Sequence, residues 1–267
     1  MLWAVAATFL ALGWSFEPAQ AENSRIEVLP CEKFEVCGQY RAWISIRGII
    51  RTGDKDRIES AFYAAGAPLG MVGVMLDSRG GSFAESLEIG RWVRSRGYVT
   101  AVMQSGTCAS ACVFILAGGI HRFAAPGQVL IHRPYLTDRG MAAIGTTMRS
   151  MIAMLREYLA DMGMHPDLAE DMIAVEPRDV RTLMMSDLQR YRLIGIDAVW
   201  AERRALERMD MLGISRDELM ERERRLAQSG EFERCEALPV SKRVRCHIEV
   251  TARFGLSILN QTKQPPR

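Results

Sequence analysis

The stretch from Val72 to Pro134 constrains the fold of this chain most strongly. It holds an adjacent glycine pair, a serine between two cysteines, and a histidine after an apolar run, in that order: Gly80-Gly81, Cys108–Cys112 and Ile131–Pro134. The pattern predicts a strand, a glycine turn, a helix, a strand, a serine-bearing turn into a second helix, and a strand that ends at the histidine. Strands and helices that alternate in this way favour a parallel sheet with right-handed crossovers.

The hydrophobic pattern predicts further elements on both sides. Strands are expected at 43–50, 71–76, 98–103 and 129–132, and helices at 56–65, 83–96 and 111–116, with 22–41 and 77–82 as loops. Apolar side chains recur every three or four residues over 141–162, which predicts an amphipathic helix. Ser186–Gln189 fits a capping box that opens a short helix. Residues 202–228 are rich in Arg and Glu, which predicts one or two solvated helices with a break near 213–215.

The composition is that of an ordinary globular protein. The chain has 267 residues, 48% of them hydrophobic, and 34 Lys and Arg balance 32 Asp and Glu. A nucleic-acid-binding protein presents a strongly basic face. The balanced charge therefore gives no reason to expect a nucleic-acid partner.

The N-terminus has the features of an export signal. Leu2–Phe16 is almost wholly apolar, and Ala19-Gln20-Ala21 has the small-x-small form of a cleavage site. The apolar run is shorter than the roughly 20 residues that cross a bilayer. No Lys or Arg precedes it, so an uncleaved membrane anchor remains the alternative. We expect residues 1–21 to be a signal peptide and the mature protein to be periplasmic or secreted.

Six cysteines follow this segment, an even number that suits an oxidising compartment. They fall into three close pairs, which favours three local disulfides among the 15 possible connectivities: Cys31–Cys37, Cys108–Cys112 and Cys235–Cys246. No Cys-x2-Cys spacing occurs, and no histidine lies at ligand spacing from a pair. No metal site is therefore expected.

Ser110 is the candidate nucleophile. It lies between two alanines in a predicted turn at the start of a helix, where free backbone amides favour negative charge. A nucleophilic serine also needs a base and amide donors for the oxyanion. Gly80-Gly81 allows close backbone approach, and His132 follows a strand. The alternative is structural: a buried serine bonded to its own helix, a tight glycine turn and a packed histidine.

Four motifs in order resemble the proteolytic subunit of the Clp protease: Leu76–Ser82, Gly106–Ala111, Arg122 with Pro126, and Leu130–Pro134. The resemblance extends over about 44–199 and places the chain in the wider crotonase-like superfamily. It is strongest to exported, Clp-like bacterial proteins whose cysteines flank the serine. It implies an α/β fold, the Clp-like crotonase spiral of stacked βαβ units, with a protruding helix and here a helical C-terminal appendage.

The same resemblance implies the roles of the site residues. Ser110 is the nucleophile, His132 the general base, and the amides of Gly81 and Ala111 the oxyanion hole. Asp179 matches the third member, which would hold the histidine tautomer.

Two alternatives for the site are open to the sequence. Asp171 and Asp138 compete with Asp179 for the third position. Related signal-peptide peptidases use a lysine base, but this chain has no lysine between 56 and 241. A lysine base within the core is therefore excluded.

The expected organisation has five parts: a signal peptide (1–21), a disulfide-tied lead-in (22–42), the Clp-like core (43–200), a charged helical appendage (201–259) and a disordered tail (260–267). The implied function is that of an exported serine endopeptidase that acts through an acyl-enzyme and forms homo-oligomers. Its substrates would be peptides or unfolded proteins. No cofactor is expected, and no ATP-dependent unfoldase, because ATP is absent outside the cell.

Two other functions compete with this one. A catalytically silent oligomeric scaffold or binding protein would keep the same fold. Acyl-CoA chemistry, as in crotonases, is disfavoured because CoA is absent outside the cytoplasm.

The pair Cys108 and Cys112 brackets Ser110. A bridge between them would stiffen the nucleophile turn, and its reduction would lower activity. The alternative is two small buried thiols that pack beside the helix.

Overall fold

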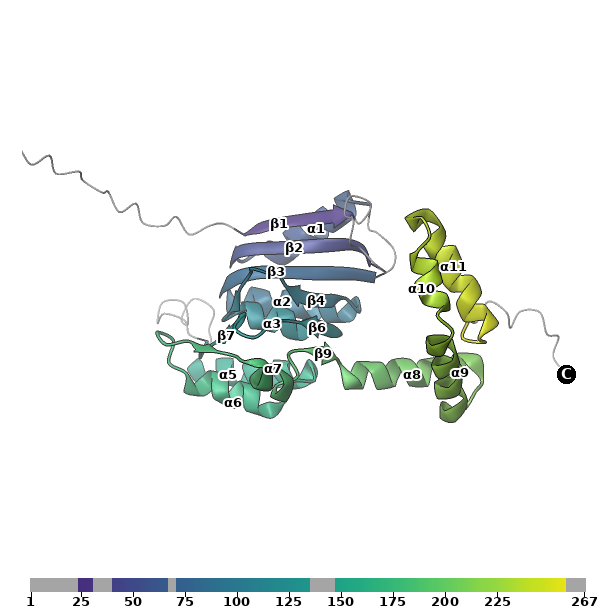
Figure 1. Cartoon of the computed structure of the whole chain (residues 1–267). Coiled ribbons are helices and arrows are strands. Elements are labelled where there is room, and N and C mark those ends of the chain that lie inside the picture. Colours follow the sequence, from purple (N-terminus) through teal and green to yellow (C-terminus); the bar gives the residue numbers. More distant parts are fainter. Residues whose placement is uncertain (1–23, 31–39, 67–70, 135–146, 258–267) are drawn as a thin grey trace, which may run out of the picture.

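The computed structural model describes residues 24–30, 40–66, 71–134 and 147–257 (Figure 1). The expected signal peptide, the cysteines at 31 and 37 and the tail from 260 lie outside these residues, as does Asp138. Within the described part, no helix has the length and apolar character needed to cross a membrane.

A nine-stranded sheet forms the centre of the described chain. Its strands are β1 (Arg25–Pro30), β2 (Tyr40–Ile50), β3 (Met71–Gly81), β4 (Val99–Val102), β5 (Cys108–Ala109), β6 (His121–Phe123), β7 (Val129–Ile131), β8 (Arg181–Thr182) and β9 (Gly195–Ile196). The order is β8-β7-β5-β3-β4-β6-β9, and β2 joins β3 to β1. The pairs of β3 with β2, β4 and β5, of β4 with β6 and of β5 with β7 are parallel.

Strand β3 changes its partner along its length. Its first half, Gly73–Leu76, pairs with β4, and Ser78 pairs with Cys108 of β5. The sheet therefore divides into two branches along β3. Strands β4 and β6 continue from its first half, and strands β5 and β7 continue from its carboxyl end. The glycine pair and the serine turn both lie at this split.

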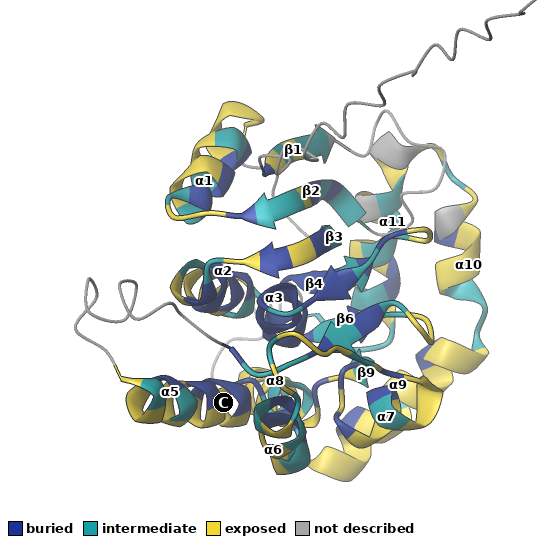
Figure 2. Cartoon of the chain, turned by 90° about the vertical axis from the view of Figure 1, so that its left-hand side faces the viewer, coloured by how far each residue is buried: buried dark blue, intermediate teal, exposed yellow. Residues whose placement is uncertain are grey.

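The helices of the described chain lie around the strands and, towards the C-terminus, extend away from them (Figure 1). They are α1 (Asp54–Ala64), α2 (Phe83–Ser95), α3 (Cys112–Gly118), α5 (Met148–Asp161), α6 (Pro166–Ala174), α7 (Met185–Arg190), α8 (Ala198–Leu212), α9 (Arg216–Gln228), α10 (Glu231–Glu236) and α11 (Val240–Arg253). Every residue of α3 is buried, because its sequence is apolar on all faces. Figure 2 shows α3 in the interior, beside α2 and the strands.

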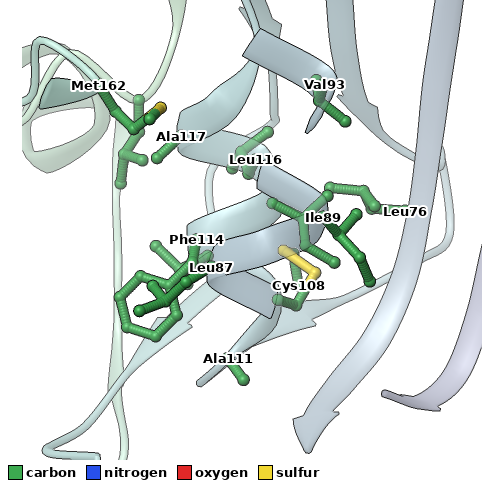
Figure 3. Packing of buried hydrophobic residues seen from close by; sticks show 14 of the residues in the cluster. Leu76, Leu87, Ile89, Val93, Cys108, Ala111, Phe114, Leu116, Ala117 and Met162 are labelled. Atoms are coloured by element: carbon green, nitrogen blue, oxygen red, sulfur yellow. A yellow bond between two sulfur atoms is a disulfide. The ribbon is translucent and has the colours of Figure 1, made fainter. Parts of the chain in front are cut away.

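The main core surrounds α3. Figure 3 shows Phe114 and Leu116 of α3 beside Leu87 and Ile89 of α2, with the disulfide at Cys108 in the same cluster. A second, smaller hydrophobic cluster lies in the C-terminal helices and the segment after α11: Leu212, Leu219, Leu226, Cys235, Val250 and Leu256. Helix α8 leads away from the first core towards the second (Figure 1).

The expected fold class is confirmed: the chain is a mixed α/β protein with a central sheet. The expected break in the charged C-terminal segment is also present, since Gly213 adopts φ 63° at the C-cap of α8 and Ser215 caps α9.

Several predicted elements were wrong in detail. The lead-in holds strand β1, which pairs antiparallel with β2 and packs Ile26 and Val28 against the core. The segment predicted as a loop after residue 76 continues β3 as far as Gly81. The cysteines at 235 and 246 lie on two helices, α10 and α11.

Two helix starts also differ from the prediction. Helix α5 begins at Met148 because Thr147 caps it, its hydroxyl accepting from the Ser150 amide. Helix α7 begins at Met185. The side chain that caps it belongs to Asp187 rather than Ser186, because the Asp187 carboxylate accepts a hydrogen bond from the Met184 amide at 3.0 Å.

Candidate active site

Ser110 occupies the turn between β5 and α3 in an unusual backbone conformation. Its φ is 54°, and Arg192 is the other non-glycine residue with positive φ in the described chain. Its amide donates to the carbonyl of Leu130 on β7 at 3.0 Å, and its own carbonyl accepts from the Val113 amide of α3 at 3.0 Å. Such a conformation costs on the order of 1–3 kcal/mol and persists only where the surroundings enforce it. The half-buried serine is thus held at a strained strand-to-helix turn.

The glycine pair packs directly against this turn. A Cβ on Gly80 would lie 2.7 Å from the Ser110 Cβ, 2.8 Å from the Ala109 carbonyl oxygen and 3.0 Å from the Ala111 nitrogen. A Cβ on Gly81 would lie 2.1 Å from the carbonyl oxygen of Ile50. The two glycines have φ values of 99° and 141°, so both the available space and the backbone conformation require glycine.

Two polar residues that the sequence analysis did not single out hold the glycine segment in place. Ser78 is buried, and its hydroxyl accepts from the Gly80 amide at 3.1 Å. The carboxylate of Asp77 accepts from the Thr107 amide at 3.1 Å, which joins β3 to the segment before β5. Asp and Ser often bond to the backbone in this way next to a turn, so their place before two glycines was an available signal.

The Ala111 amide is positioned to act as a donor. Ala111 is the N-cap residue of α3, and its N–H has no hydrogen-bond acceptor among the residues that the structure describes. The amide lies beside Gly80, at the junction of the glycine segment and the serine turn.

His132 lies at the end of the neighbouring strand. Strands β5 and β7 are parallel, with Ala109 opposite Leu130, so Ser110 and His132 both follow carboxyl ends at the same sheet edge. The Nδ1 atom of the half-buried His132 lies 2.9 Å from the Arg133 carbonyl oxygen. A carbonyl can only accept, so Nδ1 is the donor and Nε2 keeps the lone pair of a base. The described contacts contain no hydrogen bond between Ser110 and His132.

Asp179 lies near the same edge of the sheet, but its carboxylate makes no contact with the other expected site residues that the structure describes. Strand β8 pairs antiparallel with β7, and the Arg133 amide donates to the Val175 carbonyl at 2.8 Å, which brings the segment before β8 alongside the end of β7. Asp179 is exposed, and its side chain has no hydrogen bond or ion pair with any of the described residues.

The competing aspartate is bound elsewhere. Asp171 accepts hydrogen bonds from the Tyr191 hydroxyl and from Arg181, the latter at 3.1 Å. The bond from Tyr191, together with the neighbouring guanidinium groups, lowers the pKa of Asp171. Asp138 lies outside the described residues.

Two of the three expected disulfides are present: Cys108–Cys112 and Cys235–Cys246. The first joins the start of β5 to the first residue of α3 and so brackets Ser110. Both of its cysteines are fully buried. Cys31 and Cys37 lie outside the described residues.

Arg122 has a structural role. It donates to the carbonyls of Ala117 at 3.0 Å and Met162 at 2.7 Å, and to the carboxylate of Asp197 at 3.1 Å. Burial lowers the pKa of Arg122 to about 10, although the bond to Asp197 opposes this shift. The guanidinium therefore joins the ends of α3 and α5 to the start of α8.

Comparison with known proteins identifies one family. The Clp protease family model matches residues 61–176, a range that includes the glycine pair, the serine turn and His132. No protein of curated function matches the chain. Among solved structures, a point mutant of ClpP1 from Listeria monocytogenes matches with 15% identity and a TM-score of 0.45, over 57% of this chain and 88% of that chain.

Proposed function

The Clp protease family model matches residues 61–176 of this chain, and from that match we propose that the protein is an exported serine endopeptidase that cleaves peptide bonds through an acyl-enzyme. The observation that carries the proposal is Ser110 at φ 54° in a tight turn against Gly80, with the Ala111 amide beside it. A serine that served only in packing would gain nothing from this strain.

The proposed reaction begins at Ser110. Its Oγ attacks the substrate carbonyl while Nε2 of His132 removes the hydroxyl proton. The tetrahedral oxyanion is stabilised by the amides of Gly81 and Ala111. His132 then gives its proton to the leaving amine, and the acyl-enzyme remains. Water, activated by the same histidine, releases the acid product and restores the serine.

The Arg133 carbonyl supports the role of His132 in this scheme. Because the Nδ1–H donates to it at 2.9 Å, the neutral ring keeps its lone pair at Nε2. We assign Asp179 the task of stabilising the imidazolium. Its exposed carboxylate must rotate towards the ring when substrate binds, and apo catalytic contacts are commonly looser than those in the complex.

The remaining parts of the proposal follow from the family and from the cysteines. Clp protease family members form homo-oligomers and act on peptides, and we extend both properties to this chain. Two disulfides in a chain with an apolar N-terminal segment support export to an oxidising compartment. Substrates would then be short peptides or unfolded proteins that enter without an ATP-driven partner.

A catalytically silent scaffold is the second candidate. The observation that favours it is the absence, among the described contacts, of any hydrogen bond that joins Ser110, His132 and Asp179. A scaffold would keep the strained turn only as an inherited feature.

Labelling of the mature protein with a fluorophosphonate probe tests the proposal. The wild type should be labelled, and Ser110→Ala should not, because the nucleophile is absent. His132→Ala should be labelled at least about 100-fold more slowly, which is the lower end of what a general base contributes.

Controls separate loss of the site from loss of the fold. The circular dichroism spectra of both variants should match that of the wild type. His165→Ala removes a half-buried histidine at the N-cap of α6, whose ring accepts a hydrogen bond from the Asp167 amide, and should leave labelling unchanged. A folded wild type that remains unlabelled would favour the scaffold.

A further inference from the structure

We propose that the Cys108–Cys112 disulfide is a positioning element of the candidate site, which holds Ser110 in the left-handed conformation that faces Gly80. This inference rests on the proposed function, because positioning matters for catalysis only if Ser110 reacts. It assigns a task to the two cysteines beyond the general stabilisation that a disulfide supplies.

The first argument is the path of the chain. Four residues in extended conformation span about 13–14 Å, whereas the Cα atoms of Cys108 and Cys112 lie 5.2 Å apart. The chain must therefore reverse sharply between them, and the residue that makes the reversal is Ser110 at φ 54°. The bond and the strained serine depend on the same turn.

The second argument is that both ends of the bond are fixed in the core. The Cys108 amide donates to the Gln128 carbonyl at 2.8 Å, and Cys108 pairs with Ser78 on β3. Cys112 begins α3, whose residues are all buried. A covalent bond between two immobile elements fixes the short segment between them.

The third argument is the fit between the turn and the glycine segment. Gly80 leaves no room for a methyl group, since a Cβ there would lie 2.7 Å from the Ser110 Cβ. If Ser110 relaxed to negative φ, the Ala111 amide would rotate and lose its place beside Gly80. Without the bond, two backbone hydrogen bonds remain to oppose this relaxation, from Ser110 to Leu130 and from Val113 to Ser110.

The burial of both cysteines indicates that their disulfide is permanent. Each is 0% exposed and belongs to the main hydrophobic cluster, and Figure 3 shows Cys108 beside Ile89. A dissolved reductant reaches the sulfur atoms only when this part of the core opens. The bond therefore persists in the native protein, and its removal requires mutation.

The chain offers a matched control in its second disulfide. Cys235–Cys246 has a sequence separation of 11, against 4 for Cys108–Cys112. Cross-linking stabilises more as the closed loop lengthens, so the control bond should stabilise the C-terminal helices that it joins by at least as much, and it lies outside the candidate site. The two double variants Cys108→Ala/Cys112→Ala and Cys235→Ala/Cys246→Ala therefore separate positioning from stability.

Three measurements are made on the mature protein and both double variants: the fluorophosphonate labelling rate, kcat and KM on a peptide substrate, and amide hydrogen exchange at Ser110 and Val113. For the variant without Cys108–Cys112, labelling and kcat should fall between about tenfold and 100-fold, the range expected when a reacting group is misplaced. KM should stay unchanged, and both amides should exchange faster. The control variant should match the wild type in all three.

Three results would overturn the inference. The first is a wild-type labelling rate in the variant without Cys108–Cys112, and the second is an unchanged exchange rate at the Ser110 amide in that variant. The third is an equal loss of labelling in both double variants, which would indicate an effect on general stability. If the wild type itself is not labelled, the proposed function fails separately, and hydrogen exchange still decides whether the bond holds the turn. If the double variant does not fold, the single variant Cys112→Ala is used instead, because it breaks the same bond and leaves Cys108 in the core. The same changes in labelling, kcat and hydrogen exchange are expected of it.

Discussion

At the scale of single residues, the candidate site depends on one close contact between Gly80 and Ser110. The serine adopts a strained conformation that only its surroundings can enforce, and its turn packs directly against Gly80. Ser78 holds Gly80 in place, because its hydroxyl accepts a hydrogen bond from the Gly80 amide. In the proposed reaction, the reactivity of Ser110 therefore depends on backbone geometry as well as on the side chains.

Gly80→Ala tests this contact. The new methyl group meets Ser110 and the Ala109 carbonyl, so strain at positive φ and overpacking together should destabilise the fold by about 2–5 kcal/mol. Chemical denaturation gives the change in stability, and the fluorophosphonate probe gives the change in labelling, which should be nearly abolished.

Gly127→Ala is the matched control. Gly127 also has positive φ, at 85°, but no atom of the described residues lies within 4 Å of its added Cβ. Strain alone predicts a loss of about 1–2 kcal/mol with normal labelling. Equal labelling in the two variants would refute the role of the Gly80 contact.

At the scale of elements, Asp197 connects α8 to the main core. Its carboxylate caps α8 by accepting the Trp200 amide at 2.7 Å, and it pairs with Arg94 at 2.9 Å and Arg122 at 3.1 Å. All of these groups converge where α3, α5 and α8 meet. The position of α8 is thus set by a buried ion pair.

Asp197→Asn should destabilise the protein by about 3–5 kcal/mol, the cost of leaving a buried charge without its partner. Chemical denaturation measures this loss. Glu202→Gln on the same helix removes the carboxylate of an exposed ion pair with Arg216 and should cost less than about 1 kcal/mol. Similar losses in the two variants would contradict the structural role of Asp197.

The same residue predicts a dependence on pH. Burial alone would raise the pKa of Asp197, but the Trp200 amide and two guanidinium groups outweigh it, and the net shift is downward from 3.8. Its stabilising contribution is therefore complete above pH 3.8 and is lost as the pH falls through the lower, folded-state value. Acid titration of unfolding should show the wild type and Asp197→Asn converging below that pH. A constant difference would be inconsistent with this assignment.

At the scale of the whole molecule, the residues that the structure describes form two hydrophobic clusters that share no member. The larger surrounds α3, and the smaller joins α8 to α11 and contains the Cys235–Cys246 disulfide. A small cluster buries little apolar surface, so its stability depends more on the cross-link. The appendage is therefore expected to unfold separately from the core.

Calorimetry of Cys235→Ala/Cys246→Ala tests this expectation. The lower transition should lose about 3 kcal/mol, the contribution of a loop of this size, while the upper transition stays in place. Far-ultraviolet circular dichroism should show a partial loss of helix over the same temperature range. A single transition that moves as a whole would show that the two clusters unfold together.

The sequence alone determined those features that arise from local pattern. Apolar runs and helical periodicity predicted the α/β class, and Gly213 with Ser215 marked the break between α8 and α9. The order of the glycine, serine and histidine motifs predicted which residues follow strand ends. Two disulfide pairings also followed from spacing, because cysteines close in sequence meet readily in space.

Only the tertiary structure decided how these parts meet. Strands β5, β8 and β9 have two residues each, too few for any periodicity, and they exist because distant strands supply their hydrogen bonds. The switch of β3 from β4 to β5, the strained φ of Ser110 and the exposed carboxylate of Asp179 likewise depend on residues far away in the chain. A local pattern fixes which residues are apolar and where the chain can turn, but the energy of a contact belongs to both partners, and the fold alone brings them together.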